Sequence, residues 1–138
     1  AAVGLAQLER IDSAISRKRE IGQYYQNALK SIPGISLPVE STSYAKNIYW
    51  VFTLLLTDQH SRLVPDVLRN LSSLGIGTRQ FFKPLHQQPV YNKMGLFIGE
   101  HYPIAESLSE RGFYIPCGLG ITDTELAAVA SRVRSIFN

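Results

Sequence analysis

Apolar positions at the start of the chain recur at the spacing of an amphipathic helix. They fall on alternating three- and four-residue steps, with Lys18 as one interruption, and they are Leu8, Ile11, Ile15, Gly22, Tyr25, Leu29 and Ile32. Pro33 disfavours helical geometry in the residue before it. The pattern therefore predicts one long helix over residues 1–31, ending near Lys30 or Ser31, with one face against an apolar partner.

This helical pattern is already in register at Ala1, without the Ser, Thr, Asp or Asn that normally caps a helix. We therefore expect the helix to continue from a preceding segment. Two interpretations stay open: the helix packs only on its own small domain, or it also joins that domain to an N-terminal one.

Beyond the helix, the hydrophobic period changes to that of a strand. Residues 36–46 are polar and are typical of a connector. Residues 48–57 alternate with a period of two and are apolar on both faces, which predicts a central strand. Helical spacing returns over residues 64–74, and Gly75 ends this short helix.

The second half of the chain again contains predicted strands and a predicted helix. Residues 76–82 predict a second strand, and residues 83–100 form a long loop without a clear period. Loops of that length in a compact domain tend to be functional. A helix over residues 103–111 leads directly into a short strand over residues 112–115.

The last helix has the clearest start signal, because Thr122 and Glu125 have the spacing of a capping box. Its predicted buried stripe is Leu126, Val129, Val133 and Ile136. The element order is then α-β-α-β-α-β-α without internal repeats. This order predicts a single α/β (α+β) domain over residues 1–138, a small sheet covered by helices.

Composition agrees with one globular domain: the chain has 138 residues, of which 45% are hydrophobic and 18% charged. The net charge of +3 is scattered and too weak to indicate nucleic-acid binding. No apolar run approaches the roughly 20 residues that span a bilayer, and the first residues lack the features of a signal peptide. A single cysteine, Cys117, excludes an internal disulfide. We expect a cytoplasmic protein with no membrane or nucleic-acid partner.

Metal and nucleophile chemistry find little support in the sequence. His60, His86 and His101 are isolated from one another, and Cys117 has no partner at ligand spacing, so a metal site is disfavoured. A Cys–His nucleophile through Cys117 stays open, although a lone cysteine after a proline is more typical of a small buried filler.

The residues from Thr78 to Pro89 concentrate polar and aromatic chemistry at a strand end and in the loop that follows. They include two cations, two rings and an imidazole: Arg79, Phe81, Phe82, Lys83 and His86. Arginine offers a planar fork to phosphate oxygens, and phenylalanine offers a face for a base or sugar. One interpretation is a site for a phosphorylated, ring-bearing ligand. The other is a loop whose rings fill the core while its cations are only solvated, and the residue types alone do not decide between them.

Three separated segments resemble a known family. GLAQLERID with RKREI near the start, GIGTRQFFKPLHQQPVY in the middle and HYPIAESLSERGFYIPCGLGITDTEL near the end are similar to the C-terminal part of the DegT/DnrJ/EryC1/StrS sugar aminotransferases. Their perosamine synthetase branch, which serves polysaccharide and O-antigen biosynthesis, is the closest likeness. The resemblance implies a fold-type-I aminotransferase that is a homodimer and uses pyridoxal 5'-phosphate (PLP). Such an enzyme transfers an amino group from glutamate to the keto group of a nucleotide-linked deoxyhexose.

On this resemblance, the family's segment on the nucleotide-sugar side of the active site falls on residues 79–86. Arg79, Phe81, Phe82, Lys83 and His86 are then the expected substrate-binding residues. Gln80 and Cys117 stand where the family commonly has Pro and a small residue such as Ser, which leaves the identity of the substrate open.

The resemblance also implies that the cofactor lysine lies in a large N-terminal domain. None of Lys18, Lys30, Lys46, Lys83 and Lys93 stands in a Ser-rich context like that of the family's Schiff-base lysine. We therefore expect this chain alone to bind no PLP and to be inactive. The alternative is a stand-alone, non-catalytic α/β module for ligand binding or dimerisation.

Overall fold

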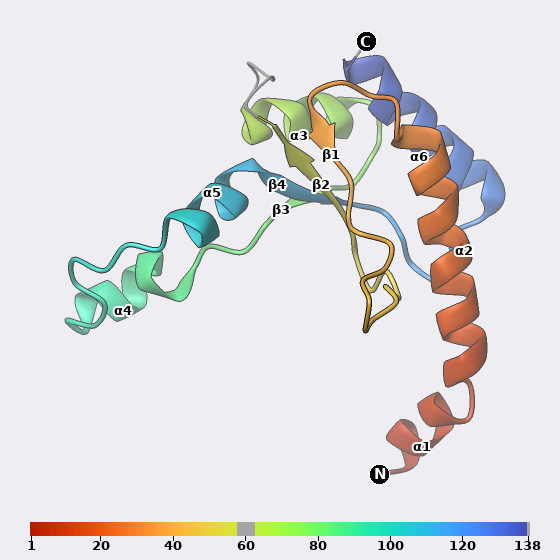
Figure 1. Ribbon diagram of the computed structural model, residues 1–138, viewed down its shortest axis with the longest axis horizontal. Coiled ribbons are helices and arrows are strands. Elements are labelled where there is room, and N and C mark those ends of the chain that lie inside the picture. The colour runs from red at the N-terminus through yellow and green to blue at the C-terminus, as the bar shows by residue number, and fades with distance from the viewer. Residues whose placement is uncertain (58–62, 138) are drawn as a thin grey trace.

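The computed structural model describes residues 1–57 and 63–137, which form a four-stranded antiparallel sheet and its covering helices (Figure 1). The strands are β1 (Ile35–Ser36), β2 (Phe52–Leu56), β3 (Arg79–Gln80) and β4 (Gly112–Ile115), in the spatial order β1-β2-β4-β3. Phe52 pairs with Ile115, and Leu54 pairs with Phe113. The prediction of a central strand is confirmed, because β2 lies between β1 and β4.

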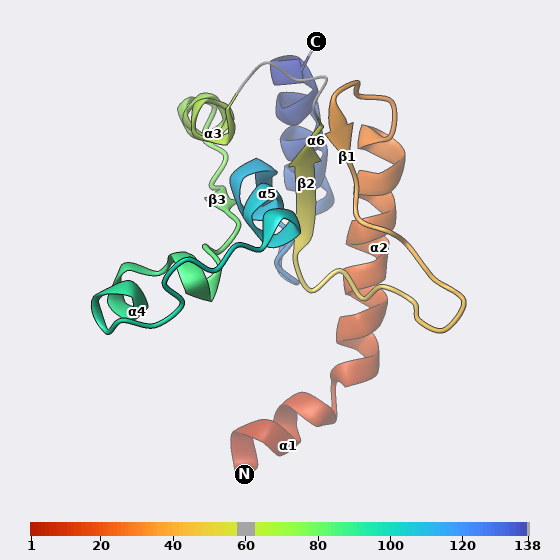
Figure 2. The same cartoon turned by 60° about the vertical axis from the view of Figure 1, so that its left-hand side comes forward.

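Helices cover both faces of this sheet. The helices of the described residues are α1 (Ala2–Leu8), α2 (Ile11–Leu29), α3 (Val64–Ser73), α4 (Pro89–Lys93), α5 (Pro103–Arg111) and α6 (Asp123–Phe137), with one 3-10 turn, η1 (Leu85–Gln87), and of these α1 and α4 lie away from the sheet (Figure 1). α2 and α6 pack side by side on one face, and α5 lies on the other (Figures 1 and 2). The predicted small sheet covered by helices is confirmed. No helix within the described residues is both long and apolar enough to cross a membrane.

The core forms where β2 and β4 meet α2 and α6. Burial in β2 alternates, and Phe52, Leu54 and Leu56 are its buried residues. The ring centroid of Tyr25 in α2 lies 5.0 Å from that of Phe52, and the Tyr25 hydroxyl donates a 2.7 Å hydrogen bond to the carbonyl oxygen of Pro116. Burial raises the pKa of Tyr25. The predicted stripe of α6 is buried in full.

Several predicted boundaries are confirmed almost to the residue. α5 and β4 occupy the predicted ranges, and α3 ends before Gly75, whose φ of 77° is the left-handed conformation that favours glycine. The capping box of α6 is present. The Glu125 N–H donates to Thr122 Oγ1 over 3.2 Å, and the Thr122 N–H donates to Glu125 Oε2 over 2.8 Å.

The prediction of one helix over residues 1–31 is wrong, because the helix breaks at Glu9 and Arg10 into α1 and α2. Ser13 donates to the Arg10 carbonyl oxygen over 2.8 Å, and the acidic Asp12 occupies the first turn of α2, as favoured at a helix start. The apolar stripe is buried only from Gly22 onward, whereas Leu8 is 62% exposed. The interruption at Lys18 has a structural role, since its Nζ donates to the Cys117 carbonyl oxygen over 2.7 Å.

The strand predicted over residues 48–57 begins only at Phe52. Tyr49 has a φ of 50°, a left-handed conformation that interrupts the extended chain before β2. Its N–H donates to the Asn47 side-chain oxygen over 2.7 Å, and its ring stacks on Phe52 at a centroid distance of 5.7 Å. The chain therefore turns at Tyr49 to place this ring in the core.

Three other predicted segments differ in detail. The polar connector over residues 36–46 overlaps β1 at Ser36, and the strand over residues 76–82 contracts to β3. The predicted loop over residues 83–100 contains η1 and α4. These two short helices extend away from the sheet as an arm (Figure 1).

Candidate functional site

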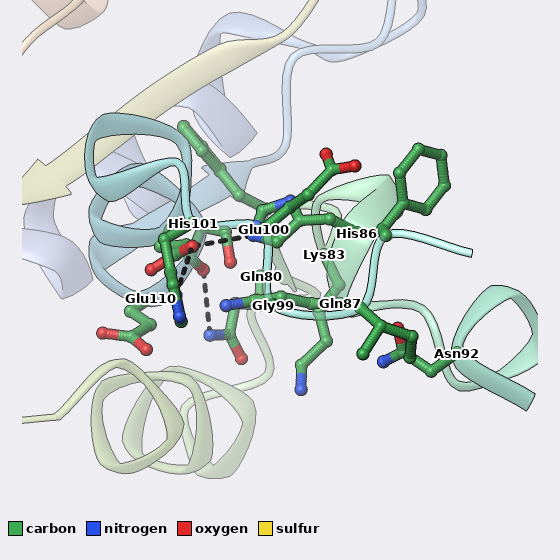
Figure 3. A pocket seen from close by; sticks show the side chains of 14 residues that line it. Gln80, Lys83, His86, Gln87, Asn92, Gly99, Glu100, His101 and Glu110 are labelled. Carbon is green, nitrogen blue, oxygen red and sulfur yellow. Dashed lines mark hydrogen bonds and ion pairs between the residues drawn. The ribbon is translucent and has the colours of Figure 1, made fainter. Parts of the chain in front are cut away.

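A cavity of about 650 Å³ lies where the end of β3, η1, the return segment over residues 97–101 and α5 meet (Figure 3). Phe81, Lys83 and His86 line this cavity on the side of the predicted segment, and Glu106 and Glu110 line it from α5. Its walls thus come from residues 80–92 and 97–110, which residues 93–96 connect.

The structure brings three of the five predicted site residues to the cavity. Arg79 does not line it and instead borders a surface hollow with Tyr114, while Gln80, the next residue along β3, faces the cavity. Phe82 is 76% exposed and also lies outside the lining.

Phe81 is held in place by β4. Its ring stacks on Tyr114 with centroids 4.8 Å apart, and its N–H donates to the Gly112 carbonyl oxygen over 2.9 Å. A Cβ added to Gly112 would lie 2.3 Å from the Phe81 ring. The missing side chain at Gly112 therefore lets the ring sit directly on the strand, where it forms an aromatic wall.

His86 is a buried polar residue of the site. It is 8% exposed, and its Nε2 lies 2.7 Å from Glu106 Oε1 (Figure 3). The same carboxylate oxygen accepts a 2.8 Å hydrogen bond from the Tyr102 N–H. These contacts, the Tyr102 N–H first and then His86, hold the pKa of the Glu106 carboxyl below its usual value.

Glu106 is absent from the predicted site, as are the other carboxylates of the lining, Glu100 and Glu110. An acidic residue in the first turn of a helix that opens with Pro103 is a signal for a helix start. That signal could have identified Glu106 as a cap, but no local pattern connects it with His86.

The cavity is acidic. Three carboxylates line it, those of Glu100, Glu106 and Glu110, against the single ammonium group of Lys83, together with the imidazoles of His86 and His101. Like charges would oppose a phosphate inside it. Carboxylates, imidazole and the amides of the lining can instead exchange hydrogen bonds with hydroxyl groups, beside the aromatic face of Phe81.

The cavity described above does not fit PLP. The cofactor needs a lysine, an acid at its ring nitrogen and donors for its phosphate. Lys18 is engaged with the Cys117 carbonyl oxygen, and Lys83 lines a cavity that also contains three carboxylates, which oppose a phosphate. The exposed Lys30, Lys46 and Lys93 lie outside this cavity. We therefore assign no step of a PLP reaction to these residues.

Cys117 is buried, as expected of a small filler, at 8% exposure. Its Sγ lies 3.5 Å from Lys18 Nζ. Within residues 1–57 and 63–137, no group of three His, Cys, Asp or Glu side chains could hold a metal ion. His60 lies outside the described residues.

Comparison with known proteins gives a consistent family match. The sequence model of the DegT/DnrJ/EryC1/StrS aminotransferase family matches residues 1–134. GDP-perosamine synthase from Vibrio cholerae is 29% identical over 138 residues, covering 100% of this chain and 36% of its own length. EpsN from Bacillus subtilis, a putative pyridoxal phosphate-dependent aminotransferase, is 31% identical over 139 residues and is covered over 35% of its length.

Solved structures share the fold. PseC from Helicobacter pylori, an aminotransferase of pseudoaminic acid biosynthesis, superposes with a TM-score of 0.86 at 20% identity, covering 99% of this chain and 36% of PseC. The PLP form of the putative sugar aminotransferase Spr1654 from Streptococcus pneumoniae gives a TM-score of 0.83 at 19% identity, covering 96% of this chain and 33% of Spr1654. The chain thus spans about a third of the length of the relatives it matches.

Proposed function

Because this chain belongs to the DegT/DnrJ/EryC1/StrS aminotransferase family, we propose that it is the C-terminal part of a PLP-dependent nucleotide-sugar aminotransferase. The observation that carries the proposal is the match of GDP-perosamine synthase along the whole of this chain. On that basis the substrate is a GDP-linked 4-keto-6-deoxyhexose, glutamate is the amino donor, and the enzyme is a cytoplasmic homodimer.

The proposed place of residues 1–138 in this enzyme is the small domain, with α1 and α2 leading from a PLP-binding large domain. Two observations support it. The matched relatives are about three times as long as this chain. In α1, Val3, Leu5 and Leu8 are between 60% and 78% exposed, an apolar face that suits contact with further protein.

The proposed contribution of this domain is substrate binding. The Phe81 ring offers a flat apolar face to a sugar, and His86 offers a buried hydrogen-bonding group beside it. Arg79 and Phe82 outside the cavity, and the exposed Lys83 at its edge, remain the proposed contacts for the phosphates and the nucleotide. PLP, held by the large domain, would supply the amino-transfer chemistry.

A stand-alone ligand-binding or dimerisation module is not favoured. The family match covers nearly the whole chain, and the relatives reported above are aminotransferases or perosamine synthases by name. A non-catalytic module would explain neither the match nor its extent.

The test compares the complete reading frame that contains these residues with the 138-residue chain. Each protein is incubated with PLP, GDP-4-keto-6-deoxymannose and glutamate, and products are identified by mass. We expect the complete protein to form the GDP-linked amino sugar and the 138-residue chain to form none. Borohydride reduction that fixes PLP stoichiometrically to one lysine of the 138-residue chain would contradict the domain assignment, and a complete protein that aminates no nucleotide sugar would contradict the function.

A further inference from the structure

We propose that Glu106 is a positioning residue that fixes the tautomer of His86, so that Nδ1 of His86 accepts a hydrogen bond from a hydroxyl of the sugar ring. This inference rests on the proposed function, because it names the part of the nucleotide sugar that the cavity takes. It goes beyond that function by assigning a role to Glu106 and a direction to the hydrogen bond.

The first step is the state of the carboxylate. Glu106 Oε1 lies 2.7 Å from His86 Nε2 and accepts the Tyr102 N–H over 2.8 Å, and His101 Nδ1 lies 3.9 Å away. Each of these groups favours the ionised form, and accordingly the pKa of Glu106 is lowered. An ionised carboxylate can only accept hydrogen bonds.

The second step concerns the ring. Because Glu106 cannot donate, His86 Nε2 must carry a hydrogen to form the observed contact. A neutral imidazole has one N–H, so Nδ1 is then an acceptor. A flip of the ring would exchange Nε2 for a carbon and leave Glu106 without this donor. The ring is also confined, at 8% exposure and with the Tyr102 ring packed edge-on at a centroid distance of 4.9 Å.

The third step is the ligand. Among the described residues the structure shows no hydrogen bond to His86 Nδ1, and His86 lines the cavity. The matching group must be a donor, and the three carboxylates around the cavity disfavour an anionic group such as a phosphate. A sugar hydroxyl meets both conditions. The cavity therefore takes the glycosyl part of the substrate and leaves the phosphates outside.

The tautomer can be measured on the 138-residue chain by ¹⁵N NMR of its imidazoles. We expect His86 in the Nε2–H form in the wild type. In E106Q we expect a mixture of tautomers, since an amide can either donate to the ring or accept from it. E125Q is the matched control: Glu125 also accepts a backbone N–H at a helix start, from Thr122 over 2.8 Å, and contacts no histidine. An Nδ1–H form in the wild type would overturn the proposal even if E106Q did not fold.

The consequence for substrate is measured in the complete enzyme. E106Q is expected to lower kcat/KM for the nucleotide sugar by about three- to tenfold, mainly through KM, with the KM for glutamate unchanged. H86A should lower it at least as much, and E106Q should add little in the H86A background, because Glu106 acts through His86. E125Q should have no effect.

The outcomes are distinct. Effects of E106Q and H86A that multiply, or a wild-type KM in E106Q, would overturn the role of Glu106 while the proposed function stands. An enzyme that aminates no nucleotide sugar refutes the proposed function and with it the sugar contact, whatever the NMR tautomer shows.

Discussion

Replacing Gly22 with alanine is expected to destabilise this protein, although the same change stabilises most helices. Gly22 lies in the middle of α2, where alanine is favoured by about 1 kcal/mol over glycine. Its new Cβ would lie 2.1 Å from Tyr49 Cδ2, whereas ordinary contact begins at 3.4 Å. The ring cannot move away easily, because Tyr49 is 3% exposed and stacked on Phe52.

Overpacking of a buried site costs roughly 1–3 kcal/mol, which exceeds the gain in helix propensity at most of this range. We therefore expect Gly22→Ala to lower the free energy of unfolding by up to about 2 kcal/mol, measured by urea titration with far-ultraviolet circular dichroism. Gly4→Ala is the control, because no atom lies within 4 Å of a Cβ at that position in α1. Its free energy of unfolding should be unchanged or slightly higher.

A double-variant cycle identifies the cause. In a Tyr49→Ala background the ring is gone, so Gly22→Ala should become neutral or stabilising by up to about 1 kcal/mol. Equal losses in the two backgrounds, or a gain in the wild-type background, would refute the packing argument.

Three further changes test the packing and capping of the same fold. Gly112→Ala should lower the free energy of unfolding in urea by about 1–3 kcal/mol, because its Cβ would lie 2.3 Å from the Phe81 ring. Thr122→Ala should lower it by about 1 kcal/mol at an unchanged urea m value, since α6 loses the side-chain acceptor for the Glu125 N–H. The Glu125 carboxylate accepts hydrogen bonds from the Thr122 N–H and hydroxyl, and these hold its pKa below 4.5. The stability that this ionised carboxylate contributes is present above pH 4.5 and is lost as the pH falls through the lowered pKa. Acid titration of Glu125→Gln should accordingly show a shallower loss of stability below pH 4.5 than the wild type.

Elements whose signals are local could be predicted from the sequence almost to the residue. α5 opens with Pro103 and leads directly into β4, and α6 opens with the Thr122 and Glu125 box, so neither boundary depends on distant contacts. The family and the fold were likewise identifiable, because three separated segments resemble the same enzymes. Period and capping chemistry are encoded within a few neighbouring residues.

Features created by distant contacts could not be predicted in this way. The alternation around Tyr49 has the period of a strand, yet the residue turns into a left-handed conformation because its ring packs against Gly22 of α2. Ser36 joins the sheet only because Leu55 of β2 offers it a partner. A single sequence contains no local signal for either pairing.

The same distinction between local signals and distant contacts applies to the candidate site. Phe81, Lys83 and His86 could be predicted as a group because they are neighbours in the sequence, and the structure brings them to one cavity. Glu106 was missed because its contact with His86 joins residues 20 positions apart. Arg79 lies outside the cavity, which residue types alone did not reveal.

Helix α5 connects the two residues that hold the side chains of this site in place. Glu106 lies in the first turn of α5 and contacts His86. Gly112 follows directly after the last turn, and the Phe81 ring packs against it. Gly112 also pairs with Leu55 in the centre of the sheet. Because α5 runs into β4 without a loop, the spacing between the imidazole and the aromatic wall is set by a helix and by sheet pairing. Side chains placed on such rigid elements keep their geometry better than side chains placed on loops, which is why a cavity at the base of an extended arm can still present a defined surface to a ligand.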